Sequence, residues 1–498
     1  MEAIVDASGV AARVEARLPV GVRPRQLSVR TLLVGMLLAA AADRPAHLTR
    51  VLAALRALPE GDRRRLGVDA AWPAGAHPLT YRQLEYTLKR IVRALAKDEP
   101  DGTPSDALSD VLDRLLEASV QHASAPASSS LAVDWTDHES FSRPPPEPDA
   151  ACADPEASWG RRRRHGPGDK DELFYGYYLQ VATIVKDDDH PDADHPDAGE
   201  LVRRITLTSC HVDPPSALVP VLERLTNSGI KLTDVLADSG YAYRMPEHWA
   251  LPVRRLGAQL VVDLHPNDRG PHGTHMGAIR CNGNLYCPAT PRPLLELAPL
   301  ARGATPDQTA THDNQTAELA RYKLSKLTSY DADGYHRVAC PATQGKLRCP
   351  LRRDSMTLPH THPEILTPPT EPPACCRQQT LTVPPTVNAK TAQKHDYPSA
   401  AHRRSYARRS AAERAYATTK DPATTNLTHG WCRLMGLTPN ALFATTAYVI
   451  RNLRITDAHA ARHADNARRH ANGLPPKTRR RRRRDTIDDL ITTAHRPP

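Results

Sequence analysis

The run SYARRSAAERAYATTKD, residues 405–421, decides how the rest of this 498-residue chain is interpreted. At about 3.6 residues per helical turn, Tyr406, Arg409, Glu413 and Lys420 fall on one side of a helix. That side carries a carboxylate flanked by an aromatic ring and two cations. An acid among cations suits a metal site beside phosphate groups, whereas a solvated helix face with an Arg409–Glu413 ion pair is the simpler alternative.

Two acids upstream follow short apolar runs. Asp134 lies in SSSLAVDWTD and Asp238 lies in LTDVLADSGY. Each apolar run is typical of a buried β-strand whose carboxyl end presents the acid. Two such aspartates and a helical glutamate supply the oxygen ligands that two Mg²⁺ ions, or Mn²⁺, need for phosphodiester chemistry. The sequence therefore predicts Asp134, Asp238 and Glu413 as metal ligands and catalytic residues.

Together these motifs resemble the DDE transposases of bacterial insertion sequences, within them the group with a Tyr-Arg-Glu-Lys signature. The resemblance rests on VDWTD around Asp134, on ADSGY from Asp238, and on the helical run, and it covers residues 130–455. The block DELFYGYYLQVATIV, residues 171–185, also resembles the second and third core strands of that family. The implied fold is α/β, with a ribonuclease-H-like mixed sheet flanked by helices.

The same resemblance implies a function. The chain would cleave DNA at transposon ends and transfer the strands into target DNA, using divalent metal ions at the acidic triad. Tyr406, Arg409 and Lys420 would contact the DNA backbone near the cleaved end. The partners would be the terminal repeats and target DNA, bound by a protein dimer. Two alternatives stay open: a catalytically inactive, transposase-derived DNA-binding protein, and a structure-specific nuclease of the same fold.

Other residues near the triad are assigned no catalytic role. Asp137 is an odd number of positions from Asp134, so in a continuing strand it faces the other side of the sheet. Asp263 ends the apolar run LVV and is the alternative to Asp238. Trp135 either stacks on a displaced base or fills the core.

Hydrophobic periodicity and composition divide the chain into units. Residues 20–122 are typical of a helical bundle, with Ser28, Thr80 and Ser105 as N-caps. This bundle either binds DNA ends or serves only for packing and dimerisation. The expected units are a helical DNA-binding or assembly domain (1–122), the first part of the catalytic core (131–250), a β-rich insertion (251–400), C-terminal core helices (401–455) and a basic tail (456–498).

The separation of Asp238 from Glu413 exceeds what a plain ribonuclease-H core needs, so an inserted unit is expected between them. After the triad, residues 430–455 are expected to form two helices broken at Gly436 and Pro439. Short strands are expected in the insertion at AQLVVDLH (258–265), GNLYCP (283–288), YHRVACP (335–341) and TLTVP (380–384).

Four cysteines of the insertion form two pairs, Cys281 with Cys287 and Cys340 with Cys349. The phrase CPAT begins at both Cys287 and Cys340. Two thiolate pairs suit a structural Zn²⁺ site, and ordinary buried thiols are the alternative.

The chain is basic, with 66 Lys and Arg against 56 Asp and Glu, and the net charge of +10 favours polyanionic partners. Lys477 and Arg479–Arg484 supply seven of the ten charges, so the positive surface of the remaining chain is expected to be local. A second basic run, expected either to grip DNA phosphates or to form a surface loop, comprises Arg161, Arg162, Arg163 and Arg164.

The N-terminal region predicts the compartment. Glu2 and Asp6 disfavour a signal peptide, and the apolar stretch 31–42 is too short to span a bilayer. A cytoplasmic, nucleoid-associated bacterial protein without membrane contact is therefore expected. In a reducing compartment its nine cysteines would be thiols or metal ligands rather than disulfides.

Overall fold

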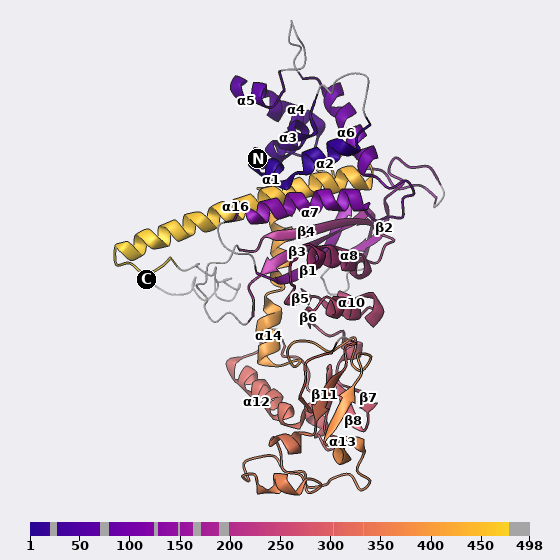
Figure 1. Ribbon diagram of the computed structural model, residues 1–498, viewed down its shortest axis with the longest axis vertical. Coiled ribbons are helices and arrows are strands. Elements are labelled where there is room, and N and C mark those ends of the chain that lie inside the picture. Colours follow the sequence, from indigo (N-terminus) through magenta and orange to yellow (C-terminus); the bar gives the residue numbers. More distant parts are fainter. Residues whose placement is uncertain are drawn as a thin grey trace, which may run out of the picture.

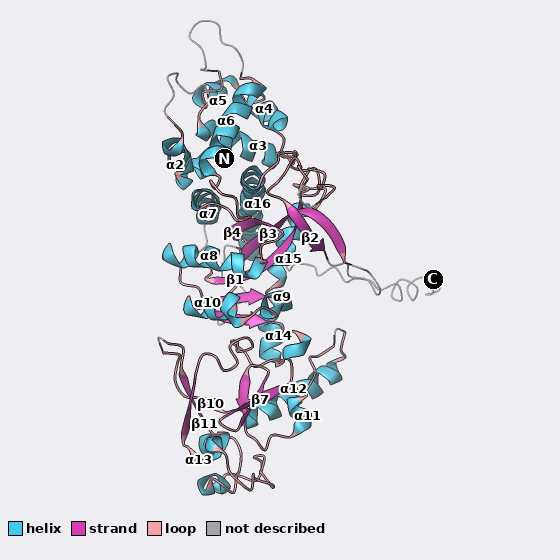
Figure 2. Ribbon diagram, turned by 90° about the vertical axis from the view of Figure 1, so that its right-hand side faces the viewer, coloured by secondary structure: helices cyan, strands magenta, loops and turns pink. Residues whose placement is uncertain are grey.

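The computed structural model describes residues 1–19, 27–69, 79–123, 128–147, 150–162, 171–188, 199–301, 303–331 and 333–477. A helical bundle, a mixed sheet and a smaller unit of short strands follow one another along the long axis of the molecule (Figures 1 and 2). Helices and strands intermingle along the chain, so the expected α/β class is confirmed.

Within the described residues, seven helices precede the first strand. The expected caps of three of them are present: Ser28 accepts from the Thr31 N–H, Ser105 accepts from the Leu108 N–H, and Thr80 forms a capping box with Gln83. The seven helices are α1 (Glu2–Ser8), α2 (Val10–Arg17), α3 (Val29–Ala41), α4 (Leu48–Arg56), α5 (Glu60–Arg65), α6 (Tyr81–Leu95) and α7 (Asp106–Gln121).

The main sheet contains six described strands in the order β2-β3-β1-β5-β6, with β4 also paired to β3. Strands β1 to β4 are joined by antiparallel pairings, whereas β1, β5 and β6 pair in parallel. The strands are β1 (Ser130–Glu139), β2 (Ser158–Arg162), β3 (Glu172–Val185), β4 (Val202–Ser209), β5 (Asp234–Ala237) and β6 (Gln259–Val262).

One expectation about this sheet is wrong, and one of its strands was not predicted. Residues 171–185 were expected to hold two core strands but form the single strand β3, and the next strand is β4. All residues of β4 are buried, but Arg203 and Arg204 interrupt its apolar run, so the sequence did not indicate a buried strand there. Glu117 of α7, which is distant in sequence, compensates both charges. It pairs with Arg203 at 2.8 Å and with Arg204 at 2.6 Å.

Helices cover both faces of the sheet. Leu131 and Val133 of β1 pack on the side of α8 (Pro214–Asn227) and α10 (Ala250–Arg255), while Ala132 belongs to the core on the opposite side. That opposite core contains residues of α15 (Ser410–Lys420), α16 (Leu437–Ala471) and the N-terminal helices. The bundle therefore shares one continuous hydrophobic core with the sheet.

Helix α16 differs from its prediction. It runs unbroken from Leu437 to Ala471, where two helices broken at Gly436 and Pro439 were expected. Gly436 is the N-cap, with a positive φ of 98°, and Pro439 lies in the first turn, where a helix tolerates the missing N–H. The last turns project from the body (Figure 1). The Arg479–Arg484 run lies outside the described residues.

The insertion contains two three-stranded sheets and short helices. The runs at 283–288, 335–341 and 380–384 form strands as expected, but the run at 258–265 supplies β6 of the main sheet, so the insertion begins after β6. Its elements are β7 (Pro271–His275), β8 (Ala278–Cys281), β9 (Asn284–Tyr286), α11 (Arg292–Leu295), α12 (Pro306–Tyr322), β10 (Ser325–Lys326), β11 (His336–Ala339), α13 (Ala374–Arg377) and β12 (Thr380–Val383).

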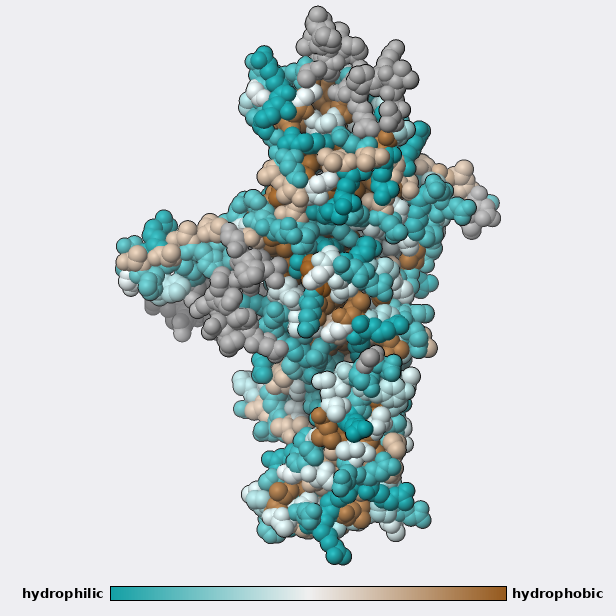
Figure 3. Space-filling model, viewed as in Figure 1, coloured by the Kyte–Doolittle hydropathy of each residue, from teal (hydrophilic) through white to brown (hydrophobic). Residues whose placement is uncertain are grey.

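The surface is mostly hydrophilic on the face drawn in Figure 3, with apolar residues in small separate areas. Among the helices that the structure describes, none combines the length and apolar character needed to cross a membrane.

Candidate active site

Asp134 and Asp238 come from neighbouring parallel strands. Leu131 pairs with Val235 and Ala132 pairs with Leu236, so the same register carried two residues further places Asp134 beside Asp238. Pairing between β1 and β5 ends at Ala132, while β1 itself continues to Glu139 against β3. Asp134 therefore lies inside a long strand and not at its end, at the point where the parallel neighbour stops.

Asp238 is oriented by the backbone that follows it. It is the N-cap of the short helix α9 (Ser239–Ala242), and its Oδ1 accepts from the N–H groups of Gly240 at 2.9 Å and Tyr241 at 3.4 Å. A Cβ at position 240 would lie 2.5 Å from the Trp135 ring and 3.0 Å from Asp238 Oδ1. Gly240 thus allows the strand, the cap and the indole to approach one another.

Trp135 fills the core on the far side of β1. Its ring centroid lies 4.7 Å from that of Tyr241, which is fully buried and lies 4.7 Å from Trp249 in turn. Of the two sequence interpretations of Trp135, this packing favours the core-filling one.

Glu413 lies in the first turn of α15, after a kink. The single helix expected over 406–420 is divided into α14 (Ala400–Ala407) and α15, with i→i+3 hydrogen bonds from Arg409 N to Tyr406 O at 2.9 Å and from Ala412 N to Arg409 O at 3.1 Å. The tightened turn places Arg409 between two acids. It forms an ion pair with Glu413 and lies 3.6 Å from Asp134.

Two anchoring residues of this helix pair were given no role by the sequence. The Tyr416 hydroxyl donates to the backbone carbonyl of Asp134 at 2.6 Å and accepts from the Val181 N–H at 3.1 Å, which fixes α15 against β1 and β3. Arg408 donates to Asp234, at the start of β5, at 2.8 Å. The position of Tyr416 on the same helix side as Glu413 was the only sequence signal for either residue.

The electrostatics of the site reflect crowded acids. Burial, followed by the charge of Asp238 and, more weakly, that of Glu413, raises the pKa of Asp134 to about 7, although Arg409 and the Trp135 N–H oppose the shift. Asp134 is 16% exposed and Glu413 is 55% exposed. The three predicted acids thus converge, although they are far apart in sequence.

Lys420 and Arg162 lie with a second group of acids. The Lys420 ammonium donates to Thr136 Oγ1 at 2.8 Å and to Asp137 Oδ1 at 3.2 Å. Arg162 pairs with Asp137 at 2.8 Å and also with Glu139. Burial alone would raise the pKa of Asp137, but the charges of Lys420 and Arg162 outweigh it and lower the pKa. Asp137, a neighbour of the triad in sequence, is therefore part of a balanced ion-pair network.

The remaining predicted residues are placed as follows. Tyr406 stacks on His402 with ring centroids 5.7 Å apart, and the Arg409 guanidinium lies 5.5 Å from its ring. Arg161 is exposed on β2, while Arg163 and Arg164 lie outside the described residues.

Asp263, the alternative to Asp238, has other partners. The Tyr397 hydroxyl donates to it at 2.9 Å and Arg269 lies 3.2 Å from it. These contacts make Asp263 part of the local structure. The acids that act with burial to raise the pKa of Asp134 are Asp238 and, more weakly, Glu413.

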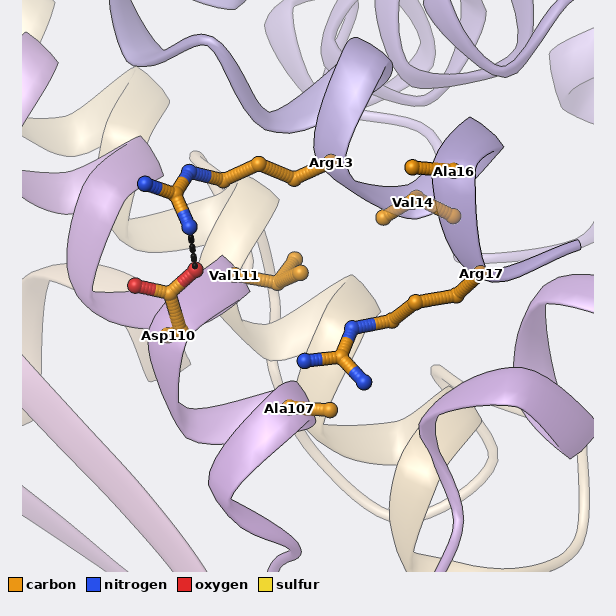
Figure 4. Close-up of a pocket in the computed structure, with 7 residues that line it drawn as sticks. All are labelled: Arg13, Val14, Ala16, Arg17, Ala107, Asp110 and Val111. Atoms are coloured by element: carbon orange, nitrogen blue, oxygen red, sulfur yellow. Dashed lines mark hydrogen bonds and ion pairs between the residues drawn. The ribbon is translucent and has the colours of Figure 1, made fainter.

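Metal coordination would require some movement of side chains. Among the residues that the structure describes, no three His, Cys, Asp or Glu side chains are close enough to hold an ion as they lie. The hollow drawn in Figure 4 is elsewhere, between α2 and α7, where Arg13 and Asp110 form an ion pair at 3.5 Å.

Models of known protein families and curated protein sequences were both compared with the chain, and neither comparison gave a match.

Proposed function

We propose that the chain is a DDE-type transposase that cleaves DNA at transposon ends and joins them to target DNA. The observation that carries the proposal is that burial and the charges of Asp238 and Glu413 raise the pKa of Asp134, while Arg409 lies against both Asp134 and Glu413. Like charges crowded around the buried Asp134 cost stability, so their retention in one place favours a functional use over a structural one.

The topology supports a ribonuclease-H-like core. The sheet is mixed, with antiparallel pairing on one side of β1 and parallel pairing on the other, and helices cover both faces, which fits the mixed, helix-flanked sheet that the resemblance implies. The short-stranded insertion lies between Asp238 and Glu413, again as the resemblance implies. Because fold alone does not define function, the proposal rests first on the three acids of the site, and the topology is additional support.

The donor set fits a hard divalent cation. Asp134, Asp238 and Glu413 offer only oxygen, and the crowding that raises the pKa of Asp134 is relieved by positive charge. These three residues would hold Mg²⁺ or Mn²⁺. When bound, the two ions supply an activated oxygen nucleophile and stabilise the leaving oxygen.

The chain's own cations would orient the DNA. Arg409 can exchange its carboxylate partners for a phosphate, since its planar fork matches both groups. Tyr406 supports the guanidinium from one side. Lys420, held at Asp137, lies further along β1 and would contact a phosphate away from the scissile bond. Gly240 lets the Trp135 ring pack closely beside Asp238.

The partners and compartment follow from the same proposal. The N-terminal helices, whose core is continuous with the sheet, would transmit contacts made by end binding or dimerisation to the active site. The Arg479–Arg484 run would grip phosphates without reading bases, and so would Arg161, Arg163 and Arg164, whereas Arg162 is paired with Asp137 and Glu139. A bacterial, nucleoid-associated protein in the cytoplasm fits such partners.

The test is cleavage of a duplex that contains the element's terminal repeat, with Mg²⁺ and the full chain. Asp134→Ala, Asp238→Ala and Glu413→Ala are each expected to abolish cleavage while gel-shift binding of the repeat persists. Asp263→Asn is the matched control, because it removes a nearby carboxylate outside the triad, and it is expected to cleave. Cleavage by any of the three alanine variants would contradict the assignment of that residue.

Two further outcomes of this assay separate the alternatives. Wild-type protein that cleaves but never joins ends to a target plasmid would be a structure-specific nuclease. Wild-type protein that binds the repeat and never cleaves it with either metal would be a DNA-binding derivative.

A further inference from the structure

Three segments of the insertion repeat the same local structure. Cys287, Cys340 and Cys349 are each followed by proline, and the carbonyl of each accepts from the N–H three residues on, at 3.0, 3.1 and 2.8 Å respectively. In the first two segments a threonine hydroxyl also donates to that carbonyl, at 2.6 and 2.8 Å. Proline pre-sets φ for such turns, so three identical turns each present a cysteine from a fixed backbone.

Backbone N–H groups point at the sulfur atoms in two of these turns. The Ala289 N–H donates to the Cys287 sulfur, and the N–H groups of Leu351 and Arg352 donate to the Cys349 sulfur. Burial raises the pKa of Cys287 to about 12 and also raises the pKa of Cys349, and these N–H groups oppose that effect. A bound cation would supply the larger opposing charge. Thiolates are the form of cysteine that binds metals.

The three turns meet in one place, and a fourth thiol joins them. Cys287, Cys340 and Cys349 are buried in one hydrophobic cluster, which also contains Cys281. Cys376, from α13, packs against the neighbouring cluster at β11 and β12, and its sulfur is close enough to those of Cys287 and Cys349 to interact with them electrostatically. Cys281 faces elsewhere, since its thiol donates to the Leu295 carbonyl at 3.3 Å.

These four cysteines link otherwise separate pieces of a unit with little regular structure. Cys287 directly follows β9 of one small sheet, and Cys340 directly follows β11 of the other. Cys376 lies just before β12, and Cys349 lies in the long irregular segment between β11 and α13. Small units with limited cores are commonly stabilised by a metal, and a tetrahedral ion would join both sheets and the irregular segment.

We propose that Cys287, Cys340, Cys349 and Cys376 form a structural Zn²⁺ site, with Cys376 replacing Cys281 of the predicted set. Four thiolates in a closed site are the set that structural zinc prefers. The sulfur atoms must move closer than they lie here, because the ion replaces their protons and draws the turns together. This inference does not depend on the proposed DNA chemistry.

The test is the metal content of the full chain, purified without added zinc and dialysed against a weak chelator. About one Zn²⁺ per chain is expected by mass spectrometry. Cys376→Ser and Cys340→Ser are expected to lose it. Cys281→Ser and Cys375→Ser are the matched controls, one from the pair expected from sequence and one adjacent to Cys376, and both are expected to keep it.

A second measurement works even if the serine variants misfold. Replacing zinc with Co²⁺ in the wild-type chain should give the intense thiolate-to-cobalt absorption and visible bands of a tetrahedral four-sulfur site. A strong chelator should then make residues 264–399 more sensitive to proteolysis. Wild-type protein without tightly bound zinc or a cobalt spectrum would overturn the proposal, as would zinc that is lost with Cys281→Ser and kept with Cys376→Ser.

Discussion

Asp134 and Asp137 lie three residues apart on β1, and each belongs to a group of acids. The surrounding residues neutralise the charge of one group and not that of the other. At Asp137, Lys420 and Arg162 approach the carboxylate at 3.2 and 2.8 Å, and the pKa of Asp137 is lowered despite burial. At Asp134, Arg409 is shared with Glu413, and burial beside Asp238 raises the pKa to about 7. The same strand thus carries one neutralised and one crowded carboxylate.

The difference separates a structural carboxylate from one available to a ligand. A network whose charges balance stabilises the fold and gains nothing from a cation. A crowded group of acids is destabilising until a cation arrives, which is the condition for tight metal binding. The four predictions below test this contrast.

The largest effect is expected on catalysis. Asp134→Asn should lower metal-dependent cleavage by about 10³-fold or more, because losing a metal ligand removes several kcal/mol of transition-state stabilisation and about 1.4 kcal/mol is tenfold. Asp137→Asn should lower it by less than about tenfold. Single-turnover cleavage of the terminal repeat measures both. Equal losses would show that the two acids are not functionally distinct.

The next effect is on stability against pH without divalent metal. The pKa of Asp134 is raised from 3.8 to about 7, so its contribution to stability is present below pH 3.8 and is lost as the pH rises to about 7. The loss should be on the order of 2–4 kcal/mol. Urea unfolding in a chelating buffer from pH 4 to 8 should show this fall, and Asp134→Asn should lack it.

In the same experiment, Asp137 should change the free energy of unfolding with pH in the opposite direction. Its pKa is lowered, so its contribution is present above its unfolded pKa of 3.8 and is lost as the pH falls below that value.

Mg²⁺ at pH 8 should restore stability to the wild type and do little for Asp134→Asn. Stability of the wild type that is unaffected by Mg²⁺ would contradict metal binding at this site.

Arg409 is expected to have an intermediate effect. Arg409→Ala should reduce single-turnover cleavage by about 10- to 100-fold, because a bidentate phosphate contact is lost. Arg409→Lys should restore only part of the rate, since a point charge replaces a planar fork. A gel-shift measurement of the end complex should show weaker binding in both variants. Unchanged rate and binding would make Arg409 only the partner of Glu413.

The smallest effect is expected for Lys420. Lys420→Ala removes contacts to Thr136 and Asp137 and should lower the free energy of unfolding by about 1 kcal/mol. Its effect on cleavage should be smaller than that of Arg409→Ala, because the ammonium lies at the neutralised cluster. Urea unfolding and the same cleavage assay measure the two quantities. A larger cleavage defect than that of Arg409→Ala would place Lys420 at the scissile phosphate.

Local signals predicted the parts of the fold that depend on neighbouring residues in sequence. The caps at Ser28, Thr80 and Ser105 bond to groups three residues away, so the sequence contains the whole interaction. The apolar runs before Asp134 and Asp238 likewise predicted buried strands, and their parallel pairing brings the two acids together.

Distant partners explain what was missed. Strand β4 was hidden by Arg203 and Arg204, whose charges are offset by Glu117 on another helix. No glycine or proline marks the kink between α14 and α15 in the sequence. The kink coincides with the hydrogen bond that Arg408 donates to Asp234. Lys420 shares a helix with Glu413, but its partner on β1 is set by how α15 crosses the strand.

Helix α16 has a consequence for the length of DNA that the protein would cover. Its first part, through Asn452, is buried against the sheet and the bundle, and its last turns project from the body as an arm (Figure 1). Residues 457–471 extend about 22 Å at 1.5 Å per residue, and the arm ends in Arg468 and Arg469. For a duplex lying along the arm, this distance adds about six base pairs to the nuclease-protected footprint, at about 3.4 Å per base pair.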